Sequence, residues 1–449
     1  MTQSVRSIAA EILVKVDKGD SSELLLEESI QKASIKQPDK GLLTELVFGT
    51  LRWRQYLDEY LRKFSDRPLH QIDKFVLQAL RVAAYQILKL DKIPESAAVD
   101  EAVKSVKGSK VHYSAGFVNG VLRSLSRSKP KADTKDSLKN LYDANEVASI
   151  FSHPKWMIDR WQRRFGVEQT VEICKANNFT PPTTLRVNFL ATTREAYLNK
   201  LKREFKDGEI VGTTKISPQG IMLKKSGSIK LLPGFNEGLF VVQDESSQLA
   251  AYVLDPKPHE EILDVCAAPG GKSTHLAELM ENKGQITACD ISQSRLEMVK
   301  KNAQRLKISI IKTKVQDAKK KFADKYDRIL LDTPCTGSGV IRRHPEAKWN
   351  RVEAEIPKFR RTQISLLKNA ASSLKEGGVL VYSVCSFNPE ECEEVIYGLL
   401  ETCKYFEIDD IKTFLPQSAA QYVSADRFFR SFPSPFGMDG FFMARLKKH

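Results

Sequence analysis

Two cysteines stand where this chain could do covalent chemistry. Cys335 follows the apolar run Ile329-Leu-Leu-Asp332, and Cys385 follows Val379-Leu-Val-Tyr-Ser-Val384. Each run predicts a buried strand, and each cysteine comes where the chain leaves that strand for polar loop residues. A thiol there, if its pKa is lowered from about 8.5, is a strong nucleophile. The residues alone leave open which of the two cysteines attacks.

A glycine pair follows another apolar run, Ile262 to Val265. The loop reads Cys266-Ala267-Ala268-Pro269-Gly270-Gly271-Lys272, and the pattern then predicts a helix. A strand, a glycine loop and a helix N-terminus form a cradle for a nucleotide-type ligand. A P-loop NTPase is disfavoured because that motif needs glycine where Cys266 stands. Since G-x-G-x-x-G is also missing, the loop favours a ligand without a pyrophosphate, such as S-adenosylmethionine.

Three acids end or follow predicted neighbouring strands: Asp290, Asp317 and Asp332. An acid after the second strand of such a sheet is placed to hold ribose hydroxyls, and Asp317 could accept from an adenine amine. Asp332 could hydrogen-bond N3 of a pyrimidine. The alternative for each acid is a helix N-cap, which is a common role of aspartate after a strand.

These groups together fit methyl transfer to a pyrimidine. C5 of the ring is too weak a nucleophile to take a methyl group. Thiolate addition at C6 makes C5 carbanion-like and solves that problem. A second residue must then help to remove the C5 proton so that the enzyme is released.

The elements around these residues predict a multidomain chain, because 449 residues exceed one core. Apolar stripes at helical spacing predict an all-α bundle over 1–128, and a polar linker follows over 129–144. A small α+β domain is expected over 145–240. From 241 to 449, strands alternate with helices, which predicts a doubly wound α/β sheet. Its strands are expected at 262–265, 285–289, 309–315, 327–332 and 378–384, with a late antiparallel strand at 441–446.

The composition points to a globular protein with a polyanionic partner. The formal net charge is +14, which suits nucleic acid, although a merely basic surface is an equal alternative. No apolar run approaches the roughly 20 residues of a membrane span. Seven unevenly spaced cysteines argue against a disulfide framework, and no cluster predicts a metal. A reducing cytoplasm is expected, and a monomer is assumed.

The chain resembles the RNA cytosine-5 methyltransferases of the Nop2/Sun group. The likeness rests on the 266–272 loop, on Asp332-Thr-Pro-Cys335 and on Tyr382-Ser-Val-Cys385-Ser. The stretch from Gly337 to Glu346, with Lys348-Trp349, is similar to the bacterial 16S ribosomal RNA subfamily of the Sun, or RsmB, type. The helical first domain looks like the NusB-type RNA-binding domain of that subfamily, so the resemblance covers nearly the whole chain.

The resemblance implies site roles. Residues 266–272, Asp290, Asp317 and Asp332 would bind S-adenosylmethionine. Cys385 would attack C6, Cys335 would assist product release, and the substrate would be 16S ribosomal RNA with the target base turned out of its stack. Two departures from the family pattern are Val384, where threonine is usual, and Cys392, where asparagine is usual.

RNA contacts are predicted from basic residues beside the site and in the helical domain. Arg342, Arg343 and His344 follow the Cys335 loop and could meet a phosphate. Arg52 and Arg81 are among the helical-domain residues that could do the same, or that could form a solvated face. Two alternative functions stay open. One is methylation of a tRNA or another rRNA site, and the other is a non-catalytic RNA-binding or antitermination factor.

Overall fold

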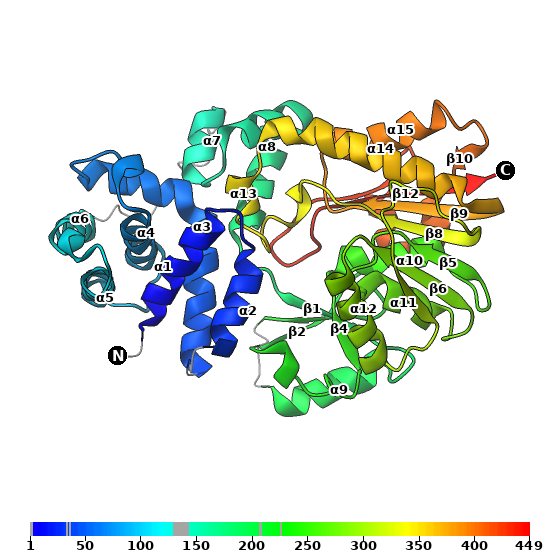
Figure 1. Ribbon diagram of the computed structural model, residues 1–449, viewed down its shortest axis with the longest axis horizontal. Helices are drawn as coiled ribbons and strands as arrows, with labels where there is room; N and C mark the ends of the chain where they lie inside the picture. Colours follow the sequence, from blue (N-terminus) through cyan, green and yellow to red (C-terminus); the bar gives the residue numbers. More distant parts are fainter. Residues whose placement is uncertain (1–2, 33–34, 36, 129–142, 206–208, 225–226) are drawn as a thin grey trace. The chain divides into compact units, whose positions relative to one another are not determined.

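The computed structural model describes residues 3–32, 35, 37–128, 143–205, 209–224 and 227–449. The chain forms two compact units (Figure 1). Unit 1 comprises residues 1–180 and 341–353, and unit 2 comprises 181–340 and 354–449. The predicted polar linker falls almost wholly on 129–142, outside the described residues.

Unit 1 is built from helices, as the apolar stripes of 1–128 predict. Their bounds are α1 Val5–Val16, α2 Ser22–Lys32, α3 Gln37–Phe64, α4 Lys74–Lys89, α5 Glu95–Lys107, α6 Ala115–Arg127, α7 Ala144–Ile150, α8 Lys155–Asn178 and the short α13 Ala347–Asn350. The buried faces of α1 and α3 to α6 share one apolar core. Asp73 begins α4 because its carboxylate accepts hydrogen bonds from the backbone N–H groups of Phe75 and Val76.

Helices α7 and α8 belong to unit 1, although the periodicity of 145–240 predicts that they join the small α+β domain. The backbone explains the difference. Ser152, between the two helices, accepts a hydrogen bond from the Gln55 backbone N–H of α3 at 3.0 Å, and the Ser149 hydroxyl donates to Glu59. The unit boundary therefore falls between residues 180 and 181 rather than between 144 and 145.

A short segment that follows the Cys335 loop in sequence also belongs to unit 1. The ammonium of Lys348 is fully buried and donates to three oxygens there: Arg52 O at 3.1 Å, Ser152 O at 3.1 Å and Asn178 Oδ1 at 2.7 Å. The Trp349 indole N–H donates to the Leu51 carbonyl at 2.7 Å. These contacts join residues 341–353 to the helical unit.

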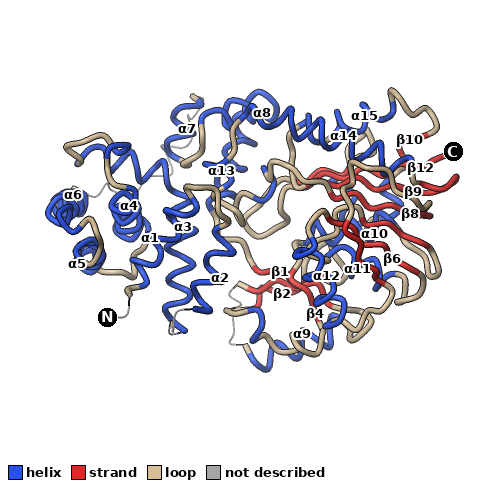
Figure 2. Tube along the Cα trace, in the orientation of Figure 1, coloured by secondary structure: helices blue, strands red, loops and turns tan. Residues whose placement is uncertain are grey.

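Unit 2 holds two sheets (Figure 2). The smaller is antiparallel, with the order β2-β3-β1-β4, and is the sheet of the expected α+β domain. Its strands are β1 Thr183–Val187, β2 Ile210–Thr213, β3 Gly220–Leu223 and β4 Phe240–Val242, and α9 Arg194–Glu204 accompanies them. Leu185, Val187 and Phe240 of the sheet share a small core with Tyr197 and Leu201 of α9.

The larger sheet has the order β10-β12-β9-β8-β5-β6-β7, and β11 pairs with β12. Its strands are β5 Glu261–Asp264, β6 Gln285–Asp290, β7 Ile311–Val315, β8 Tyr326–Asp332, β9 Leu374–Val384, β10 Phe406–Ile408, β11 Phe429–Ser431 and β12 Phe441–Lys448. Strands β5 to β9 are mutually parallel. The five predicted parallel strands are confirmed to within a few residues, and the late strand is antiparallel to β9. Strand β10 at the edge has no sequence prediction.

Successive residues of the central strands alternate between two cores. Ile262 and Leu330 face a core shared with α10 Glu245–Leu254 and α11 Gly271–Leu279. Leu263 and Leu331 face the opposite core, shared with α14 Ile356–Ser372 and α15 Glu393–Leu400. Helix α12 Gln293–Arg305 packs against β6 through Ala288. The doubly wound architecture is therefore confirmed.

In the described residues, no helix is both long and apolar enough to span a bilayer. In the same residues, no group of three or more His, Cys, Asp and Glu side chains could hold a metal ion.

Candidate active site

The sheet order reverses between β5 and β8, and the candidate residues lie there. The chain moves outward from β5 through β6 to β7 and, on the other side, from β8 to β9. At such a switch point, the loops after adjacent strands diverge and leave a crevice at the carboxyl ends. The 266–272 loop follows β5, Asp332 ends β8, and Cys385 directly follows β9.

The glycine loop leads directly into α11. Gly270 has φ +99° and precedes the first residue of the helix, and no side chain caps this helix end. A Cβ on Gly270 would also lie 3.1 Å from the Val299 backbone, so glycine fits both the conformation and the space. The peptide bond between Ala268 and Pro269 is cis. The loop thus presents uncapped backbone donors at the strand ends.

The carboxylate that ends β5 lies beneath this loop. Asp264 is buried, and the Ser273 hydroxyl of α11 donates to it at 2.6 Å. Burial raises the pKa of Asp264 to about 7, and the Ser273 hydrogen bond opposes this shift.

The other two predicted cofactor acids lie at the ends of β6 and β7. Asp290 is almost fully buried, accepts from the Ser292 backbone N–H at 3.0 Å, and lies 3.2 Å from the Arg295 guanidinium. Asp317 is half-buried and accepts from the Lys319 backbone N–H at 2.9 Å. Both acids therefore make local turn bonds and lie at the carboxyl edge of the parallel sheet.

Lys272 and Asp332 form an ion pair at the switch point. Lys272 Nζ donates to Asp332 Oδ2 at 2.7 Å, and Ser383 Oγ donates to Asp332 Oδ1 at 2.7 Å. Burial opposes the Lys272 charge, but Asp332, then Cys385 and Asp264, raise the pKa of Lys272 above its ordinary value. Lys272 therefore keeps its charge, which interacts electrostatically with Asp332, Cys385 and Asp264.

The two candidate thiols are brought together. Cys335 Sγ and Cys385 Sγ lie 3.0 Å apart, and both residues are half-buried. The hydrogen bond to Cys385, then burial and the charges of Cys385 and Glu391, raise the pKa of Cys335 well above its ordinary value. Cys335 therefore holds its proton more tightly than a free cysteine does, and its thiol is in hydrogen-bond contact with the Cys385 sulfur.

Four further cysteines, Cys174, Cys266, Cys289 and Cys392, are disfavoured as nucleophiles by burial. All seven cysteines are free thiols. Burial raises the pKa of Cys174 and Cys266, and raises that of Cys289 to about 12. Cys392 is buried, its thiol donates to the Ser386 carbonyl at 3.4 Å, and burial raises its pKa. The family departure at residue 392 thus packs as a small apolar group rather than as a reactive one.

Comparison with known proteins assigns the chain to a family. Residues 251–447 match the 16S rRNA methyltransferase RsmB/F, residues 3–127 match the NusB family, and residues 153–230 match the ferredoxin-like domain of RsmF/B-like methyltransferases. The chain is 38% identical to the probable ribosomal RNA small subunit methyltransferase B of Bacillus subtilis, over 99% of both chains. It is 36% identical to the ribosomal RNA small subunit methyltransferase B of Proteus mirabilis, again over 99% of both chains.

The chain belongs to the RsmB/F family of 16S rRNA methyltransferases. A solved structure, that of PH0851, covers all of this chain and all of its own at 28% identity with a TM-score of 0.83. The predicted resemblance to the RsmB-type subfamily and the predicted fold class are confirmed. The chain is therefore an S-adenosylmethionine-dependent methyltransferase with a NusB domain.

The residues of this RsmB/F methyltransferase fit that cofactor. The uncapped start of α11, the left-handed Gly270 and the nearly buried Asp290 are the parts of a nucleoside cradle. Residues 266–272, Asp290, Asp317 and Asp332 would hold S-adenosylmethionine, which supplies an electrophilic methyl group. The assignment of each of these residues to the cofactor stays a prediction.

The predicted RNA contacts are partly overturned by burial. Arg342 is fully buried, so its side chain offers no surface to a phosphate. Arg81 is buried against Asp58, with Nε and Nη2 donating to the two carboxylate oxygens at 2.7 and 2.8 Å. Arg52 is also buried, and it donates to the Arg342 carbonyl at 3.2 Å. Arg81 and Arg52 therefore make buried contacts within unit 1. Arg343 and His344 are half-buried.

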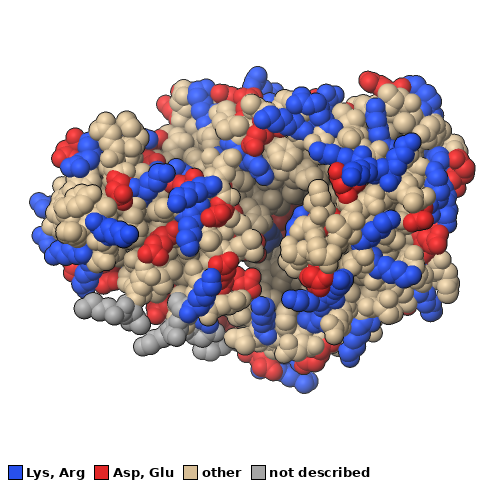
Figure 3. Space-filling model, viewed as in Figure 1, with Lys and Arg blue, Asp and Glu red and all other residues tan. Residues whose placement is uncertain are grey.

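Basic side chains are not gathered in one patch on the face that Figure 3 draws. Lys and Arg are spread over that face and are interspersed with Asp and Glu. On this face, the basic side chains are therefore spread out among acidic ones.

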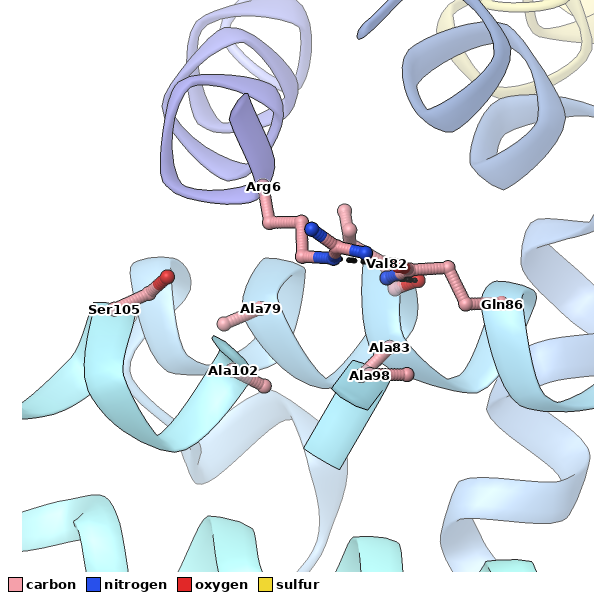
Figure 4. A pocket seen from close by; sticks show the side chains of 8 residues that line it. All are labelled: Arg6, Ala79, Val82, Ala83, Gln86, Ala98, Ala102 and Ser105. Carbon is pink, nitrogen blue, oxygen red and sulfur yellow. Dashed lines mark hydrogen bonds between the residues drawn. The ribbon is translucent and has the colours of Figure 1, made fainter. Parts of the chain in front are cut away.

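A small crevice lies between α1, α4 and α5 of unit 1 (Figure 4). Arg6 covers it and donates to Gln86 Oε1 at 2.7 Å. Its floor consists of short side chains, including Ala79, Ala83, Ala98 and Ala102. Its lining includes the Ser105 hydroxyl but no cysteine, histidine or carboxylate.

Sequence reasoning missed the polar residues that hold the thiols and the glycine loop in place. They are Arg186, Glu278, Thr336, Gln363, Ser383, Ser386, Asn388 and Glu391. Ser386, Asn388 and Glu391 follow Cys385 closely in sequence, which is the one local signal that could have found them. Arg186 lies on a strand of the smaller sheet, and no local pattern links it to the loop.

Proposed function

We propose that this protein methylates C5 of a cytosine in 16S ribosomal RNA through a covalent bond between Cys385 and C6 of the base. The observation that carries the proposal is the pair of sulfurs 3.0 Å apart at the strand ends, where Lys272 and Asp332 form their ion pair. The family supports ribosomal RNA of the small subunit as the substrate class.

The electrostatics favour Cys385 over Cys335 as the nucleophile. The Lys272 ammonium is stabilised by charge on Cys385, so a Cys385 thiolate has a cationic neighbour. The hydrogen bond to Cys385, then burial and the charges of Cys385 and Glu391, raise the pKa of Cys335, which favours its protonated form. Since the thiolate is the attacking species, Cys385 attacks C6 and Cys335 remains available for a later proton transfer.

Each step of the proposed reaction is assigned to Cys385, Asp332 or Cys335. Cys385 forms a bond to C6, and electron density moves to C5, which accepts the methyl group. We assign Asp332, which Lys272 and Ser383 hold, to N3 of the base: its carboxylate accepts a hydrogen bond once N3 has taken a proton from water. Cys335 first releases its own proton to water, and its thiolate then takes the C5 proton. The C5–C6 double bond reforms as the bond from C6 to Cys385 breaks, and the electron pair of that bond stays on the Cys385 sulfur.

Base chemistry of this kind requires the cytosine to leave its stack, because C6 is attacked from above the ring. Arg343 and His344 stay candidates for contacts to the RNA backbone. Phosphate contacts of this kind weaken as salt is added. A tRNA or another rRNA site is the competing substrate, and the test below includes it.

The roles of the thiols are tested by trapping. Wild type, Cys335→Ala, Cys385→Ala and the matched control Cys403→Ala are incubated with 16S rRNA, or with tRNA, and labelled S-adenosylmethionine. The products are run on denaturing gels. We expect Cys335→Ala to accumulate a slow-migrating protein–RNA adduct, because release fails after methyl transfer. Cys385→Ala should give neither adduct nor methylated RNA, and Cys403→Ala should match wild type.

Other results would change the proposal in defined ways. An adduct trapped by Cys385→Ala would reverse the two roles. Label on tRNA but not on 16S rRNA would replace the substrate. No label on any RNA with wild type would overturn the enzymatic function and favour a non-catalytic RNA-binding factor.

A further inference from the structure

A buried carboxylate joins the two loops that carry the thiols. Glu391 lies in the short 3-10 helix Pro389–Glu391, six residues after Cys385, and it is fully buried. Its Oε1 accepts from the Thr336 backbone N–H at 2.8 Å, and its Oε2 accepts from the Thr336 hydroxyl at 2.5 Å. Thr336 directly follows Cys335, so the first loop is held by two bonds to one carboxylate.

The same carboxylate holds the second loop. Oε2 accepts from the Ser386 hydroxyl at 2.7 Å and from Asn388 Nδ2 at 2.9 Å. Ser386 directly follows Cys385. Gln363 Nε2 of α14 donates to Oε1 at 3.3 Å and to the Pro334 carbonyl at 3.0 Å. Five N–H and O–H groups therefore meet one carboxylate, which is acceptor-only when ionised.

Further hydrogen bonds join the two loops directly. The Ser338 and Ser386 hydroxyls lie 2.9 Å apart, and the Gly339 backbone N–H donates to the Cys385 carbonyl at 3.0 Å. Gly440 N–H donates to the Gly339 carbonyl at 2.8 Å, and a Cβ on Gly339 would lie 2.0 Å from the Gly440 carbonyl oxygen. Among these contacts, Glu391 alone bonds to the residue after each cysteine.

We propose that Glu391 is a positioning residue for methyl transfer, which holds the Cys335 and Cys385 loops so that their sulfurs stay in contact. Its role in turnover rests on the proposed function, while its role in placing the sulfurs does not. A glutamine has the same shape but only one acceptor oxygen, and its NH₂ would face donors such as Asn388 Nδ2. Glu391→Gln should therefore let the two loops move apart.

The sulfur spacing can be tested without RNA or cofactor. Phenylarsine oxide bridges two neighbouring thiols: two As–S bonds form, and the oxide oxygen leaves as water with the two thiol protons. Wild type should bind one arsenical per chain, and Cys335→Ala should lose that binding. We expect Glu391→Gln to bind it at least tenfold more weakly at one fixed pH. The other titratable groups around the sulfurs are Lys272, Asp332 and Tyr382, and none of them is altered in this variant.

Turnover provides the second measurement. A misplacement of about 1 Å at a reacting group can cost roughly 100-fold in rate. We expect Glu391→Gln to lower kcat for RNA methylation by about that factor, with KM for RNA and for S-adenosylmethionine changed less than about twofold, since neither binding surface is altered. The matched control is Glu394→Gln, which removes a partly exposed ion pair with Arg360 and should leave both measurements unchanged.

The outcomes separate this inference from the proposed function. Arsenical binding by Glu391→Gln at the wild-type level, with a native circular dichroism spectrum, would overturn the role of Glu391. So would a wild type that does not bind the arsenical. If Glu391→Gln does not fold, Thr336→Val is the second test, because it removes the hydroxyl that donates to Glu391. We expect this variant to bind the arsenical several-fold more weakly than wild type. Unchanged binding would refute the inference. A wild type that binds the arsenical but methylates no RNA would refute the proposed function alone.

Discussion

A buried ion pair between the smaller sheet and α11 should control both the stability of unit 2 and its cofactor loop. Arg186 on β1 and Glu278 on α11 have side-chain exposures of 0% and 1%, and Arg186 Nη2 lies 2.7 Å from Glu278 Oε1. Arg186 also donates to Gln243, to the Gly271 carbonyl at 2.5 Å and to Thr274 Oγ1 at 3.1 Å. The guanidinium therefore bonds directly to the first residue of α11.

Arg186→Met would leave the Glu278 charge buried, with Gln219 Nε2 at 2.9 Å as a remaining donor. Removing one partner of a buried pair costs about 3–5 kcal/mol. At roughly 2–4 °C per kcal/mol for a unit of this size, the melting temperature should fall by about 6–20 °C. The lost bond to Gly271 should weaken S-adenosylmethionine binding by roughly 10- to 150-fold, since a hydrogen bond to a charged group contributes roughly 1.5–3 kcal/mol.

The tryptophans make the two units separable in the assay. All four of them, Trp53, Trp156, Trp161 and Trp349, lie in unit 1. Tryptophan fluorescence therefore follows unit 1, whereas circular dichroism follows both units. We expect Arg186→Met to lower the circular dichroism midpoint in urea by more than the fluorescence midpoint. Calorimetry with S-adenosylmethionine measures the change in binding.

A double variant and a surface control sharpen the result. Arg186→Met with Glu278→Leu should recover most of the lost stability, because no unpaired charge remains buried. Lys375→Met removes a half-exposed pair with Glu261 and Asp327 and should cost at most about 1 kcal/mol. The reasoning is refuted if Arg186→Met unfolds within about 1 kcal/mol of wild type, or if the double variant is less stable than the single one.

Two further changes test buried charges elsewhere. Burial raises the pKa of Asp264 to about 7 from about 4 in the unfolded chain, so its contribution to stability is full below pH 4 and is lost as the pH rises to 7. Asp264→Asn should therefore be more stable than wild type at pH 8 and should approach it at pH 4, as measured by urea unfolding; identical pH profiles would contradict this. Lys348→Met leaves three buried oxygens without their donor, so the free energy of unfolding of unit 1, followed by tryptophan fluorescence in urea, should fall by about 1–3 kcal/mol. The control Lys155→Met removes an exposed ion pair with Asp159 and should leave this free energy unchanged.

Local sequence patterns were enough to predict the strands and the loops that follow them. Ile262 to Val265 and Ile329 to Asp332 are apolar runs bounded by polar residues, and the structure has strands there. The glycine pair could be placed at a helix start because glycine and a following helical pattern are both local features. The parallel order then brings Asp332 and Cys385 to one edge, which explains why the candidate site could be predicted before its geometry was known.

The rest depended on contacts between distant residues. Arginine is rarely buried, so the sequence predicts Arg342 and Arg81 as surface cations, yet both are buried; for Arg81 the reason is its partner Asp58, 23 residues away in sequence. The assignment of residues 341–353 to unit 1 rests on Lys348 and Trp349, whose acceptors lie up to 298 residues away in sequence. A helical stripe such as that of α8 shows that one face is buried, but not against which neighbour.

The site of unit 2 is organised by buried charges more than by apolar packing. Three carboxylates with little or no exposure bond to the elements that form this site. Asp264 bonds to Ser273 of α11, Glu278 to Arg186 of β1, and Glu391 to the two loops that carry the thiols. Each accepts hydrogen bonds from a different loop or sheet, and only Glu278 has a buried guanidinium as its partner. Burial of such groups costs free energy unless every donor is in place, so a small displacement of a loop leaves a charge unpaired. The same arrangement that lowers stability therefore restricts the glycine loop and the two cysteines to one geometry.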